Sequence, residues 1–154
     1  MRLEPLLRPE NVQIVEAAAS RDHLLSRLAE RAHAEFPSIP GDRLLNELID
    51  REKKYPTSVP EGVAFPHAIL PDIDHTLIVA YLCKPAVNFG VKGHAPTALV
   101  FGMFANADEP WQHVRTLARL ARITHAPGAL DRIRSASDAA VLFDLLIAED
   151  RRHG

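Results

Sequence analysis

The chain has 154 residues, of which 47% are hydrophobic and 25% charged, and its formal net charge is −2. This length fits one domain over residues 1–154, and without a basic surplus neither nucleic acid nor an anionic membrane is an expected partner. The single cysteine, Cys83, excludes an internal disulfide, and no apolar run approaches the roughly 20 residues of a membrane span. The first ten residues mix acids with prolines, unlike a signal peptide. We therefore expect a cytoplasmic protein without direct membrane insertion.

The first third of the chain predicts one strand and two helices. Residues 11–17 alternate loosely, which is typical of a short strand. A helix is expected after Ser20, a favourable N-cap, and it should end by Pro37. A second helix is expected from about Asp42 to Pro56. Apolar residues recur at helical spacing in both segments: Leu24, Leu25, Leu28 and Ala32 in the first, and Leu44, Leu45, Leu48 and Ile49 in the second.

The centre of the chain predicts a sheet. Residues 62–65, 76–83 and 97–104 are rich in β-branched and aromatic side chains and are bounded by Pro, Gly and Asp. The last two segments are nearly continuous apolar runs, as expected for strands covered on both faces. Residues 84–96 between them carry turn-forming residues and are expected to form a connecting loop.

The last third is expected to be helical again. One helix should be capped near Asp108, with Pro110 in its first turn, and Pro127 with Gly128 should interrupt the helical region. Ser137 should cap a final helix. The expected apolar faces contain Val114, Leu117, Ala118 and Ala121, and then Val141, Leu142, Leu145 and Leu146. The whole pattern predicts an α/β fold with a single central mixed β-sheet flanked by helices on both faces.

One histidine follows a proline where a predicted strand ends, in GVAFPHAIL (62–70). Pro66 fixes its own φ and favours an extended Phe65, so His67 is expected at the end of strand 62–65. Ligands and chemistry collect at such strand ends in α/β folds. A lone histidine is more often a partly buried residue bonded to a backbone carbonyl, so this short motif alone does not establish a site.

Two more residues change that interpretation. Arg51 lies in the last turn of the second predicted helix, and His113 lies near the start of the helix after strand 97–104. With GVAFPHA and DEPWQHVRTLARL, these residues resemble the enzyme IIA domains of the bacterial phosphotransferase system. The resemblance is to the fructose/mannitol class, which includes the nitrogen-regulatory IIA proteins. It is strongest over residues 44–124 and extends weakly over 12–147.

The signature of that family is an Arg-Glu pair, a loop containing Ser or Thr, and then Gly-apolar-Ala-apolar-Pro-His. Here these are Arg51-Glu52, Thr57 and residues 62–67. The resemblance implies that His67 is the phosphoacceptor, with Arg51 and His113 stabilising the phosphate and Thr57 as a further phosphate contact. It implies no cofactor and no metal. It implies two partners, a histidine phosphocarrier protein as donor and a IIB domain as acceptor.

These residue types suit phosphoryl transfer. A neutral imidazole is a nucleophile near pH 7, and its other ring nitrogen must hold a proton toward an acceptor that the sequence does not identify. The planar fork of Arg51 matches phosphate oxygens, and the helix N-terminus near His113 favours an anion. Taken alone, Arg51 is better explained as one charge on a solvated helix face and His113 as surface or half-buried packing, and Thr57 can equally cap a turn.

Two questions stay open at this level. Family members commonly carry glycines where this chain has Ser58 and Pro60, so the loop before His67 is expected to be stiffer, which leaves the choice of partner open. The alternative function is that of a stand-alone regulatory IIA protein, which binds targets according to its phosphorylation state.

Other conspicuous residues give weaker signals. The eight histidines show no metal-ligand spacing, and His75 and His94 are expected to face solvent. Trp111 is interpreted as a packing or rim residue, with a partner surface as the second interpretation.

Overall fold

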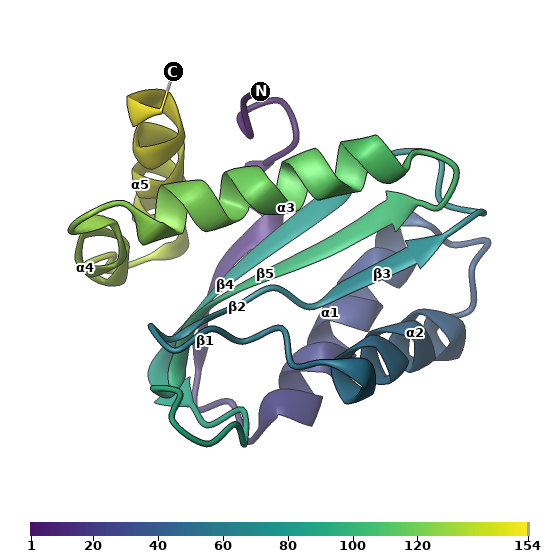
Figure 1. The fold of residues 1–154 in the computed structure, drawn as a ribbon, viewed down its shortest axis with the longest axis horizontal. Coiled ribbons are helices and arrows are strands. Elements are labelled where there is room, and N and C mark those ends of the chain that lie inside the picture. The colour runs from purple at the N-terminus through teal and green to yellow at the C-terminus, as the bar shows by residue number, and fades with distance from the viewer. Residues whose placement is uncertain (154) are drawn as a thin grey trace.

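The computed structural model describes residues 1–153, which form one five-stranded sheet with helices on both sides (Figure 1). A short 3₁₀ turn at Pro9–Asn11 precedes the first strand. The strands are β1 (Val12–Glu16), β2 (Val63–Ala64), β3 (His67–Leu70), β4 (Leu77–Val87) and β5 (Thr97–Asn106). The helices are α1 (Arg21–Glu35), α2 (Gly41–Lys54), α3 (Pro110–His125), α4 (Ala129–Arg134) and α5 (Ala139–Arg152).

The sheet is mixed, as the sequence predicts. Its order is β1-β4-β5-β2, and β3 continues beyond β2 along the same side of β5. The central pair β4–β5 is antiparallel, whereas β1 pairs with β4, and β2 and β3 pair with β5, in parallel. The short strands β2 and β3 therefore form the sheet edge that carries His67, which pairs with Met103.

Each face of the sheet is covered by its own set of helices. In Figure 1, α3, α4 and α5 lie over one face, and α1 and α2 lie over the other. Because alternate residues of a strand point to opposite faces, Val79 and Tyr81 of β4 join the core with α1 and α2, whereas Ile78 and Ala80 join the core with α3 and α5. The nearly continuous apolar runs are therefore buried on both sides, which confirms the predicted layers.

The caps of the helices are partly as predicted. Ser20 caps α1, and its hydroxyl accepts a hydrogen bond from the backbone N–H of His23 at 3.1 Å. The cap of α5 is Asp138, not Ser137, because it is the Asp138 carboxylate that accepts the N–H of Val141 at 2.9 Å. Likewise, α3 is preceded by Glu109, not Asp108, and no side chain caps it.

The inward face of α3 differs from the predicted one. Val114 is 55% exposed, and Ala118 and Ala121 also face solvent. The buried residues of α3 are Thr116, Arg119, Leu120, Ile123 and Thr124. This burial is stable because the polar groups are paired: the Arg119 guanidinium, for example, forms a buried ion pair at 2.9 Å with the Asp150 carboxylate of α5.

Three further stretches of regular structure were not predicted. These are β3, the one-and-a-half turns of α4 after Gly128, and the extension of β4 to Val87. The extension runs past Pro85, and the register against β5 shifts between Leu82 and Val87. Of the helices formed by residues 1–153, none combines the length and the apolar character needed to cross a membrane.

Candidate functional site

Arg51 and His67 are in direct contact. Arg51 lies in the last turn of α2, and its Nε–H donates a hydrogen bond to Nε2 of His67 at 3.0 Å. His67 opens β3 and does not close the strand before it, since β2 already ends at Ala64. Pro66, which has no N–H to donate, separates the two strands, and its carbonyl accepts the N–H of Met103 at 3.0 Å. The proline thus sets His67 on the sheet edge at a break in the ladder.

The other ring nitrogen of His67 fixes the tautomer. Nδ1 lies 2.8 Å from the backbone carbonyl oxygen of Phe65. A carbonyl only accepts, so Nδ1 carries the proton and donates it. Nε2 is then the unprotonated nitrogen, and its lone pair accepts the Arg51 N–H. The Phe65 carbonyl is thus the proton acceptor that the sequence could not identify.

The surroundings of His67 keep its imidazole neutral. Burial is the largest influence and lowers the pKa of His67 below its ordinary 6.5, because the interior disfavours the charged form. The nearby charge of Arg51 and the electrostatic influence of His113 lower this pKa further, whereas the hydrogen bond to Phe65 and the charge of Glu52 oppose the shift. A neutral ring with one unprotonated nitrogen is the nucleophilic form of histidine.

Glu52 organises the loop that holds Phe65. Its side chain is buried, and its carboxylate accepts hydrogen bonds from both the backbone N–H and the hydroxyl of Thr57. The carbonyl of Thr57 in turn accepts the N–H of Phe65 at 3.1 Å. Glu52 therefore acts on Nδ1 of His67 through two residues. The single hydroxyl proton of Thr57 is already committed to Glu52, and the phosphate contact of Thr57 stays a prediction.

The guanidinium of Arg51 is held at two points. Besides the bond to His67, its Nη1 donates to the Tyr55 carbonyl at the end of α2, at 2.6 Å. Its Nη2 has no hydrogen-bond partner among residues 1–153. A planar cation that is fixed at two donors and open at a third is suited to bind an anion next to Nε2.

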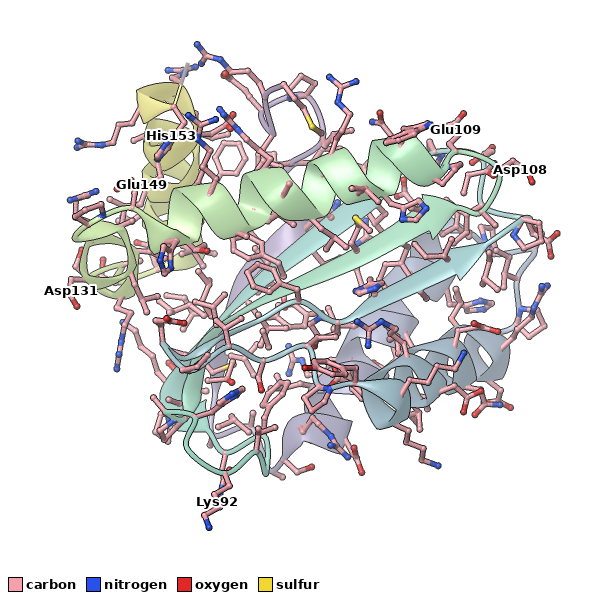
Figure 2. The ribbon with its side chains drawn as sticks, in the orientation of Figure 1. Lys92, Asp108, Glu109, Asp131, Glu149 and His153 are labelled. Carbon is pink, nitrogen blue, oxygen red and sulfur yellow. The ribbon has the colours of Figure 1, made fainter. Side chains whose placement is uncertain are left out.

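His113 lies in the first turn of α3 and is half-buried. Its helix begins just after Asp108 and Glu109, which are labelled in Figure 2. Its charge acts on the pKa of His67, but no hydrogen bond joins the two imidazoles in the part of the chain that the structure describes. The structure thus joins Arg51 to His67 directly and brings His113 within electrostatic range. The shared phosphate site of all three residues stays a prediction.

Two histidines that were expected to face solvent have specific partners. His94 is half-buried, and its Nδ1 lies 3.0 Å from the hydroxyl of Ser58, so that expectation was wrong for His94. The His75 side chain is 53% exposed, yet its ring bonds both Asp74 and Glu35. Trp111, with 79% of its surface exposed, is not a packing residue.

Sequence reasoning assigned no role to Glu52 or to the Phe65 carbonyl. Glu52 belongs to the Arg-Glu pair of the family signature, and its position next to Arg51 was the only sequence feature that pointed to it. The carbonyl gave no signal, because every residue has one and only the fold selects the acceptor.

The chain is similar to known proteins over nearly its full length. A nitrogen regulatory protein of Bradyrhizobium diazoefficiens is 29% identical over 147 residues, which cover 95% of each chain. The crystal structure of the nitrogen regulatory protein IIA-Ntr of Neisseria meningitidis superposes with a TM-score of 0.84 at 19% identity, covering 94% of this chain and 98% of that one. Enzyme IIA-Mtl of Escherichia coli, solved in complex with phosphorylated enzyme IIB-Mtl, gives a TM-score of 0.72 at 22% identity, covering 92% and 97%.

These structural likenesses, at less than 25% identity, show a shared fold. The family follows from the sequence itself, because residues 5–149 match the family model described as the phosphoenolpyruvate-dependent sugar phosphotransferase system, EIIA 2. The match spans the Arg-Glu pair, the Pro-His motif and the helix that bears His113. This chain belongs to that EIIA 2 family.

Proposed function

We propose that the protein is a phosphohistidine carrier of the phosphotransferase system and that Nε2 of His67 accepts the phosphoryl group. The observation that carries this proposal is the pair of bonds on the ring: the Nδ1 proton is held by Phe65, and the Nε2 lone pair faces Arg51. The lowered pKa of His67 supports it, because the ring stays neutral at pH 7.

In the proposed step, a phosphohistidine of the donor protein approaches Nε2. The N–P bond to His67 forms while the N–P bond of the donor breaks, and the Nδ1 proton stays in place. The ring gains positive charge, which the Phe65 carbonyl stabilises. The N–H of Arg51 moves from Nε2 to a phosphoryl oxygen, and His113 is the proposed second stabiliser of the phosphoryl charge. Such transfer needs positioning and charge stabilisation more than covalent help from the protein.

The proposed donor is a histidine phosphocarrier protein, and the proposed acceptor is a IIB domain. The complex of enzyme IIA-Mtl with phosphorylated IIB-Mtl supports a IIB partner for this fold. Trp111 and Val114, on the turn of α3 that carries His113, are 79% and 55% exposed. Exposed aromatic and aliphatic side chains beside a reacting group are typical anchors for a partner protein.

The test is phosphoryl labelling with phosphoenolpyruvate, enzyme I and the histidine carrier. Wild-type protein should incorporate one acid-labile, base-stable phosphoryl group, as a phosphohistidine does. His67→Ala should incorporate none, and His75→Ala, a change at a largely exposed histidine eight residues later, should label normally. Retained labelling of His67→Ala would overturn the site assignment.

A second function, that of a stand-alone regulator of the nitrogen-regulatory type, is favoured by one observation. The Bradyrhizobium relative, at 29% identity, is named a nitrogen regulatory protein. In that case phosphorylation of His67 selects binding partners and need not continue to a IIB domain. A wild-type protein that labels normally but does not pass its phosphoryl group to any IIB domain encoded by its own source would favour the regulator over the carrier.

A further inference from the structure

The loop before His67 is attached to the loop before β5 by one side-chain contact. Ser58 is 6% exposed, and its hydroxyl lies 3.0 Å from Nδ1 of His94. Ser58 stands at one of the two positions where the family commonly has glycine. Because Ser58 is almost fully buried, its hydroxyl has little access to water and depends on the imidazole for a partner.

Backbone contacts continue the same attachment. The carbonyl of Pro60 accepts the N–H of Ala95 at 3.0 Å, and the carbonyl of Gly62 accepts the N–H of Ala98 at 2.8 Å. Gly62 has a φ of +93°, and a Cβ there would lie 2.8 Å from the carbonyl oxygen of Pro96. The two loops therefore approach too closely to admit a larger residue at this position.

The attached loop is also the segment that holds the ring of His67. Ser58 pairs with Ala64 in an antiparallel bridge, and the carbonyl of Thr57 accepts the N–H of Phe65 at 3.1 Å. The carbonyl of Phe65 accepts the Nδ1 proton of His67. A shift of Ser58 thus moves the peptide unit that orients the imidazole. Figure 2 shows Lys92, two residues before His94 in the same loop, at the end of the molecule away from Asp108 and Glu109 at the start of α3.

We propose that Ser58 and His94 form a clasp that positions His67 for phosphoryl transfer. The clasp holds Ser58, and Glu52 holds the preceding residue, Thr57, so both contacts fix the start of loop 57–62. Neither Ser58 nor His94 touches the reacting atoms, so both are positioning residues. The clasp replaces the freedom that glycine gives to this loop with a fixed geometry. This inference rests on the proposed function, since it concerns the orientation of the same nucleophile.

A double-mutant cycle tests the clasp, using Ser58→Ala, His94→Phe and the double variant. One hydrogen bond is worth about 1 kcal/mol, so each single variant should slow the labelling of His67 by about fivefold. The double variant should be no slower than either single variant, because the same contact is lost only once. His94→Asn, which places a polar atom near the position of Nδ1, should restore most of the rate. Ser135→Ala removes a hydroxyl bonded to the Arg132 carbonyl in α4 and should leave the rate unchanged.

A spectroscopic measurement separates positioning from stability and does not need phosphate. In ¹⁵N-resolved spectra of the unphosphorylated protein, the Nδ1 proton of His67 should exchange with solvent faster in Ser58→Ala and His94→Phe than in the wild type or Ser135→Ala. Unchanged exchange of that proton, or rate losses that multiply in the double variant, would overturn the clasp. If the wild-type protein takes no label, the proposed function fails, and the exchange measurement alone decides on the clasp.

Discussion

The contact between Arg51 and His67 allows the geometry of the guanidinium to be separated from its charge. Arg51 donates from Nε to His67 and from Nη1 to Tyr55, at 3.0 and 2.6 Å. In Arg51→Lys the positive charge remains, but one ammonium on a flexible chain does not reproduce two fixed donors. In Arg51→Gln the charge is lost as well. The two variants therefore differ in one physical property.

The expected magnitude follows from these contacts. Losing one donor that stabilises developing charge costs on the order of 10²–10³ in rate, so both variants should slow the labelling of His67 by that factor. The charge of Arg51 is one of the causes that lower the pKa of His67. That pKa should consequently rise in Arg51→Gln and stay close to the wild-type value in Arg51→Lys.

Two assays check this expectation: single-turnover labelling by the phosphorylated carrier, and NMR titration of the His67 ring. His113→Ala is a useful companion, since it removes a weaker lowering influence on the same pKa and leaves Arg51 in place. Transfer by Arg51→Lys at the wild-type rate would refute the requirement for a planar fork. An unchanged titration of His67 in Arg51→Gln would show that the charge of Arg51 does not set its pKa.

Three further predictions concern the residues around this contact. Glu52→Gln keeps the shape but leaves one acceptor oxygen for the two donors of Thr57, so urea unfolding should show a loss of about 2 kcal/mol, and the pKa of His67 should fall further because a raising influence is removed. The rate of labelling should stay flat as the pH falls to 6.5 and drop only below it, because the pKa of His67 is lowered; the folded state then binds fewer protons than the unfolded state, so His67 also reduces stability as the pH falls below 6.5. Arg119→Met strands the buried Asp150 carboxylate and should cost about 3 kcal/mol in urea unfolding, whereas His67 should still take label; a loss below 0.5 kcal/mol would contradict the buried ion pair.

The sheet could be predicted from sequence because its burial is uniform. Strands β4 and β5 are covered on both faces, so their apolar runs needed no knowledge of which helix lay where. That Arg51 and His67 belong to one site could be predicted for another reason. Their spacing matches a family motif, and residues of such a motif lie close together in the fold although nothing in either residue alone indicates it. The sequence correctly placed His67 next to a strand boundary at Pro66. It put His67 at the end of the strand before Pro66, whereas in the structure His67 begins the strand after it.

The face of α3 could not be predicted, because its burial depends on distant partners. Arg119 is buried only because Asp150, thirty-one residues later, meets its guanidinium, and Asp150 also accepts the backbone N–H of Leu3. Hydrophobic periodicity assigns such a charged residue to solvent. It therefore chose the side of Val114, which in the structure is exposed beside Trp111. The residues that periodicity assigned to the core therefore lie largely on the surface, on the helix that carries His113.

Two consecutive residues at the end of α2 control the two sides of one imidazole. Successive residues on a helix point in directions about 100° apart, and here Arg51 reaches Nε2 of His67, whereas Glu52 reaches the loop that leads through Phe65 to Nδ1. Their charges act on the pKa of His67 in opposite directions, so the pair can fix the orientation of the ring without a large electrostatic penalty for either protonation state. Burial then decides the balance in favour of the neutral form. Charge patterning alone would place this Arg-Glu pair on a solvated helix face. In the fold, the two residues orient the imidazole of the proposed nucleophile, Arg51 directly and Glu52 through Thr57 and Phe65.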